Sequence, residues 1–208
     1  MSELNVIYGN KIKLKNKFVA GFVDKYIHNF RVMTSSCSAI IQIFFCLSYP
    51  ECVGICQKYE HIQIFNYNFK RCLSSVFCPG SEMINSRVVW FRGCDLNRLP
   101  YFQFVVLVES KGISHCREVI EIAKQCWAMT LGLEDFDLIS IDYSKDDSDT
   151  LRNGLIYDKN YSEFEMVRTE RCMLQQVLSL AKLIDQEITC KDGWMKRSNR
   201  PGELRHIL

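Results

Sequence analysis

The stretch YFQFVVLVE, residues 101–109, constrains the fold of this 208-residue chain more than any other. It consists mainly of aromatic and β-branched residues, which favour strands. Polar and apolar positions do not alternate along it, as they would in a strand with one face in water. A strand that is apolar on both faces is typical of the covered centre of a sheet. We therefore expect residues 101–109 to form a central strand.

The segments on either side of residues 101–109 predict two further strands and a helix. RVVWFRG, residues 87–93, predicts a second strand that ends at Gly93, and FDLISIDY, residues 136–143, predicts a third. Between them, apolar residues at helical spacing predict a helix over 114–131, capped by Ser114 and stopped by Gly132. The order strand, strand, helix, strand predicts an α+β fold with an antiparallel or mixed sheet and this helix packed on it.

The N-terminal third is harder to interpret because it contains a long uncharged run, residues 32–50. Six polar residues interrupt the run, so we do not expect a membrane span. We predict a buried helix over 36–48 and a strand over 61–69. The alternating lysines of residues 11–18 predict an exposed edge strand.

The C-terminal part predicts a long amphipathic helix over 162–188. Ser162 and Glu165 form the S-x-x-E pattern of a capping box, which marks a helix start. The apolar stripe of this helix is interpreted as core, with an interface to a partner protein or a second copy as the alternative. The candidate partner-binding residues on it are Phe164, Val167, Leu174, Val177, Leu178 and Ile184.

The eleven cysteines suggest reduced thiols in a core, because the N-terminus lacks the apolar stretch of a signal peptide. Zinc is the alternative, since cysteine and histidine are its usual ligands. No C-x2-C knuckle supports it. The candidate zinc ligands are Cys52, Cys56, His61, Cys72 and Cys78.

Nucleic-acid binding is a second functional hypothesis. The net charge of +2 provides no strong overall attraction to phosphate, but basic and aromatic residues meet around residues 87–102 and in the tail, residues 191–208. The candidate residues are Trp90, Arg92, Arg98, Lys196, Arg197 and Arg200.

Catalysis is the weakest hypothesis, because the chain has no phosphate-binding glycine loop, no GxSxG elbow and no HExxH motif. An enzyme would need a site assembled only in three dimensions, for example from His115, Cys116 and Asp142. We expect no catalytic residues and no cofactor.

The sequence as a whole predicts one domain over residues 1–190, with a sub-boundary near 78–86 and a flexible basic tail. Its wealth of Asn, Lys, Ile, Phe and Tyr is typical of AU-rich genomes, including those of many viruses. We therefore interpret the chain as a non-enzymatic interaction protein, such as a small viral accessory protein, that acts on host or viral factors. The expected location is the cytoplasm or the nucleus.

Overall fold

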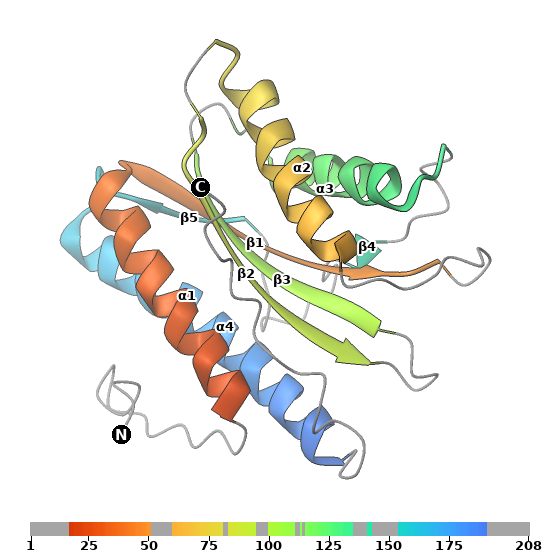
Figure 1. Ribbon diagram of the computed structural model, residues 1–208. Helices are drawn as coiled ribbons and strands as arrows, with labels where there is room; N and C mark the ends of the chain where they lie inside the picture. The colour runs from red at the N-terminus through yellow and green to blue at the C-terminus, as the bar shows by residue number, and fades with distance from the viewer. Residues whose placement is uncertain are drawn as a thin grey trace.

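The computed structural model describes residues 17–50, 60–80, 83–94, 100–110, 113, 115–134, 141–142 and 154–190. Within these segments the chain forms four helices and five strands (Figure 1). In chain order they are α1 (Lys17–Ser36), β1 (Ala39–Ser48), α2 (Glu60–Phe77), β2 (Ser86–Cys94), β3 (Pro100–Glu109), α3 (Cys116–Leu131), β4 (Ile141–Asp142), β5 (Leu155–Asp158) and α4 (Glu163–Cys190).

The five strands form one sheet in which every strand pair is antiparallel. The order is β2-β3-β1, and the outer edge of β1 is shared by two short strands. β5 pairs with residues 39–42 of β1, and β4 pairs with residues 46–47. β1 and β3 are therefore the central strands, as was predicted for residues 101–109.

Helices cover both faces of the sheet and give a three-layer architecture. Figure 1 shows α1 and α4 side by side on one face, and α2 and α3 together on the other. The fold class is α+β, as predicted. The sheet joins strands from both sides of residues 78–86, because β1 pairs with β3 along nine consecutive positions.

The two faces of the sheet bury separate apolar cores. Alternate residues of β1 point to opposite faces, so that Ile41, Ile43 and Phe45 meet α2 and α3 while Ile40 and Phe44 meet α1 and α4. Each fully buried side chain of this size stabilises the fold by about 1.5–3 kcal/mol. Because both faces are covered, the strand shows no alternation in its sequence.

Aromatic rings dominate the core beneath α2 and α3. Phe45 stacks on Phe104 with ring centroids 4.9 Å apart, and Phe65 of α2 stacks on Phe69 at 5.3 Å. Trp127 of α3 closes this layer. Its indole N–H donates to the Ser48 carbonyl at 2.8 Å, so the one polar atom of the ring is satisfied.

Two predictions for the N-terminal third are wrong. Residues 36–48 form the end of α1 and the strand β1 instead of a buried helix. Residues 61–69 lie in α2 instead of a strand, and their buried residues are Ile62, Phe65 and Phe69 at helical spacing. In the predicted strand 11–18, residues 17 and 18 begin α1, and the other residues lie outside the described part.

The predictions for the middle and the C-terminal part are confirmed with small shifts. The strand over 87–93 is β2 and the helix over 114–131 is α3. The N-cap of α3 falls on His115 rather than on Ser114, which is outside the described residues. Gly132 ends α3 in the left-handed conformation, at φ 71°, that glycine adopts without steric cost.

The last part of the chain also follows the prediction in outline. The helix over 162–188 is α4. Of the predicted strand 136–143, only β4 is described. The polar segment before α4 contains a further strand, β5, that was not predicted. Among the described residues, no helix is long and apolar enough to cross a membrane.

Candidate functional site

The predicted apolar stripe of α4 divides into a buried part and an exposed part. Leu174, Val177 and Ile184 are buried against α1 and the sheet, and Leu178 packs partly against the same core. No partner can contact these side chains while α1 and α4 stay packed. At the N-terminal end of the helix, Phe164 is 75% exposed and Val167 is 50% exposed. These two residues alone of the predicted set lie on the surface.

The capping box fixes the start of α4 and therefore the position of these two side chains. The Ser162 hydroxyl accepts a bond from the Glu165 backbone N–H at 3.3 Å, and the Glu165 carboxylate accepts one from the Ser162 N–H at 3.1 Å. The Ser162 hydroxyl also donates to this carboxylate at 2.8 Å. These hydrogen bonds lower the pKa of Glu165. Phe164 is thereby held within a well-formed first turn.

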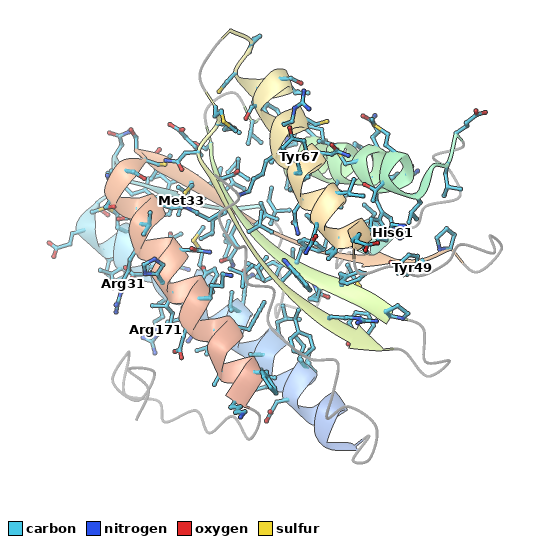
Figure 2. The ribbon with its side chains drawn as sticks, viewed as in Figure 1. Arg31, Met33, Tyr49, His61, Tyr67 and Arg171 are labelled. Atoms are coloured by element: carbon cyan, nitrogen blue, oxygen red, sulfur yellow. The ribbon has the colours of Figure 1, made fainter. Side chains whose placement is uncertain are left out.

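The surface around Phe164 and Val167 is mixed in character. Tyr161, which lies just before the start of α4, is 40% exposed and adds a third large exposed side chain close to Phe164 in the sequence. Arg168 and Arg171 are exposed on the same two turns. Figure 2 shows Arg171 on the same outer side of the molecule as Arg31 of α1. We call Tyr161, Phe164 and Val167 the α4 strip.

A buried polar network behind the strip ties α4 to the sheet. Gln42 of β1 is fully buried, and its amide donates to the Met173 carbonyl at 3.2 Å and to Gln176 Oε1 at 3.0 Å. The Tyr26 hydroxyl of α1 donates to the Gln42 side-chain oxygen. Burial, followed by the charge of Glu170, raises the pKa of Tyr26 well above its usual value, so the phenol stays protonated. This network makes α1, β1 and α4 a rigid support.

The residues of the nucleic-acid hypothesis do not form a stacking surface among the described residues. Trp90 is buried and packs edge-on against Phe102, with ring centroids 5.9 Å apart, so no base can reach its face. Arg92 lies on the same strand and is half-buried. Arg98 and the three tail residues, Lys196, Arg197 and Arg200, lie outside the described residues.

The described members of the zinc hypothesis lie apart. His61 is in the first turn of α2, where its ring meets Tyr49 with 3.3 Å between Nδ1 and the phenol oxygen (Figure 2). Cys72 lies three turns further along the helix, about 16 Å away, and Cys78 follows the helix end. No group of three potential ligands occurs among the described residues. Cys52 and Cys56 lie outside them.

The residues of the enzyme hypothesis lie on two elements, at the start of α3 and in β4. His115 is exposed at the start of α3, and Cys116 is its first residue. Asp142 pairs with Cys46 in the sheet. The sulfur of Cys116 lies beside Gly154, where a Cβ would come within 3.6 Å of it.

Comparison with known proteins identifies no relative of this chain. No protein-family model, no curated protein and no solved structure matches this chain.

Proposed function

We propose that this protein is a non-enzymatic interaction protein that docks on another protein through the α4 strip. The observation that carries the proposal is the 75% exposure of Phe164 beside the half-exposed Val167. Large apolar side chains presented by one helix turn after turn are the anchors of helix-in-groove recognition. Aromatic residues are also enriched among those that supply most of the energy at interfaces.

Rigidity of the helix supports this interpretation. The capping box orders the first turn, and the remainder of α4 is held by its apolar contacts and by the Gln42 network. Binding would therefore cost little conformational entropy in this protein, which favours affinity. The partner is expected to present an apolar groove with acidic residues at its rim, because Arg168 and Arg171 flank the strip. A role on host or viral factors in the cytoplasm or nucleus belongs to the same proposal and rests on composition alone.

The test compares a double variant and a single control variant of the tagged full-length protein in affinity purification from its natural host cell. Phe164→Ser with Val167→Ser removes the apolar side chains of the strip. Leu183→Ser is the matched control, since Leu183 lies on the same helix at 52% exposure. Serine at exposed helix positions changes stability little, so both proteins should fold.

The expected result is a discrete protein that wild type and Leu183→Ser retain in moderate salt and after nuclease treatment, and that the double variant loses. Apolar contacts tolerate salt, whereas phosphate contacts weaken steeply with it. Retention of every partner by the double variant would contradict docking through the strip. Partners that disappear with nuclease would favour nucleic-acid binding instead.

A further inference from the structure

Two cysteine side chains meet between the helices α2 and α3, which Figure 1 shows packed together on one face of the sheet. Cys72 lies near the C-terminal end of α2, and Cys126 lies in α3. Cys126 belongs to the apolar core beneath the two helices, and Cys72 packs against the same core. The two side chains are hydrogen-bonded to one another. The fold thus brings together two free thiols that are far apart in the sequence.

The hydrogen bond gives the two thiols different roles. Burial, followed by the hydrogen bond to Cys72 and the charge of its thiolate, raises the pKa of the Cys126 thiol. A hydrogen bond raises the pKa of a thiol when its own S–H is the donor, because the bond then favours the protonated form. The Cys126 thiol is therefore the donor and the Cys72 sulfur the acceptor. Because Cys126 holds its proton, the sulfur of the pair that attacks is that of Cys72.

Access to solvent indicates the same order of reaction. Cys126 is completely buried, whereas Cys72 is partly exposed. A redox-sensing cysteine is accessible to solvent and often lies beside a second thiol that completes the reaction. A small oxidant can reach Cys72, and Cys126 lies in contact with it for the second step.

Metal binding and simple packing explain the pair less well. Zinc in structural sites takes four protein ligands. Within the described segments, no third potential ligand joins the two cysteines. Packing accounts for Cys126, which is buried on all sides, but it does not explain why a second thiol meets it at the partly exposed position 72.

We infer that Cys72 and Cys126 are a redox-sensitive pair, which hydrogen peroxide or an organic hydroperoxide converts into a disulfide between α2 and α3. In the first step the Cys72 thiolate attacks one oxygen of the peroxide and the O–O bond breaks. The sulfur gives up two electrons and becomes a sulfenic acid, while the oxygen that leaves takes a proton from water.

In the second step Cys126 attacks the oxidised sulfur of Cys72. The S–O bond breaks, and the hydroxyl group leaves as water with the Cys126 proton. Rotation of the two side chains brings the sulfurs to the S–S distance of a disulfide, about 2.0 Å. Two thiols and one hydroperoxide thus give one disulfide, one water and one alcohol, or a second water when the oxidant is hydrogen peroxide.

The disulfide lies on the opposite face of the sheet from the α4 strip. The core beneath α1 and α4 contains neither of the two cysteines. A bond between α2 and α3 restricts the unfolded chain, so it should stabilise the fold. The inference does not depend on docking through the strip, and each can fail without the other.

The first experiment maps the disulfides of the wild-type protein after a small excess of hydrogen peroxide and blocking of the remaining thiols. Trypsin leaves Cys72 and Cys78 in the peptide 72–87 and Cys126 in the peptide 125–145. We expect these two peptides to be joined, with fragment spectra that assign the bond to Cys72, and to separate after reduction. Cys78 is the internal control, because it is also free and partly exposed at the end of α2.

Two variants separate the roles of the sulfurs. Cys126→Ala should leave Cys72 as a sulfenic acid that dimedone traps, because no thiol is in contact with it. Cys78→Ala should form the disulfide as wild type does. A measurement on wild type alone adds an independent check, since the urea midpoint should rise on oxidation and return on reduction.

Four results would overturn the inference. Cys72 could stay a thiol when peroxide is added to the folded protein, or it could reach the sulfinic acid while Cys126 remains a thiol. Cys78 rather than Cys72 could be joined to Cys126. A urea midpoint that does not rise on oxidation would mean that the bond forms only by distorting the fold.

Discussion

The buried network around Gln42 gives the most quantitative prediction. Gln42→Leu leaves the Tyr26 hydroxyl without its acceptor and removes one donor from Gln176 Oε1. Each buried polar group that loses its partner costs about 1–3 kcal/mol. The leucine recovers a part of this through apolar burial. We therefore expect Gln42→Leu to lower the free energy of unfolding by about 2–4 kcal/mol.

A double-mutant cycle separates the network from simple packing. Tyr26→Phe alone takes the donor from the Gln42 side-chain oxygen and should cost about 1–2 kcal/mol. In the double variant neither of these two atoms is present. Its destabilisation should therefore be smaller than the sum of the single values by about 1 kcal/mol or more. Urea unfolding followed by tryptophan fluorescence and by circular dichroism gives all four free energies.

Gln103→Leu is the control for replacing a glutamine in the sheet. Gln103 of β3 is half-buried, and its side-chain amide donates to the Phe45 carbonyl at 3.2 Å. Its loss should cost less than about 1 kcal/mol, because water reaches the site. Additivity within about 0.5 kcal/mol in the Tyr26–Gln42 cycle would refute the argument, because it would mean that the two side chains do not share a bond.

Four further predictions follow from single groups. Because the pKa of Tyr26 is raised in the folded state, the stability that its hydroxyl contributes is complete below the ordinary tyrosine pKa of 10.0. This contribution is lost as the pH rises through the pKa of the folded state. The urea midpoint of Tyr26→Phe should therefore fall less steeply at alkaline pH than that of wild type. Ser162→Ala should destabilise the fold by about 1 kcal/mol. Because the pKa of Glu165 is lowered, the difference in urea midpoint between wild type and Glu165→Gln should be full above pH 4.5 and vanish as pH falls. Burial raises the pKa of the Cys126 thiol, so peptide mapping after iodoacetamide should find Cys126 unmodified until urea unfolds the protein.

The helices and strands that were predicted correctly are marked by sequence motifs that act over only a few residues. The box at Ser162 and Glu165 and the glycine at 132 act within one helix turn, so their meaning does not depend on distant contacts. The stretch 101–109 is dense enough in β-branched and aromatic residues to exclude the helix alternative.

The errors arose where helix and strand share one sequence signal. Residues 39–48 are a continuous apolar run because both faces of β1 are covered, and such a run does not distinguish a buried helix from a buried strand. Residues 61–69 alternate over a few positions, but Phe65, Phe69 and Leu73 continue at helical spacing beyond that window. A longer window would have separated the two readings.

The candidate surfaces depend on tertiary structure that sequence reasoning could not supply. The stripe of α4 is uniform in sequence, and only the position of α1 decides that Val177 is core while Phe164 is exposed.

The pairing of β1 has a consequence for how the chain folds during synthesis. Ile41 pairs with Val108 on one side and with Ile156 on the other. Contacts so distant in sequence make folding slow. At ordinary rates of translation, roughly 5–20 s pass between the emergence of β1 and that of β5. Throughout this interval the edge of β1 that pairs with β5 has no partner strand. We therefore expect the nascent chain to bind chaperones, and products truncated before β5 to aggregate.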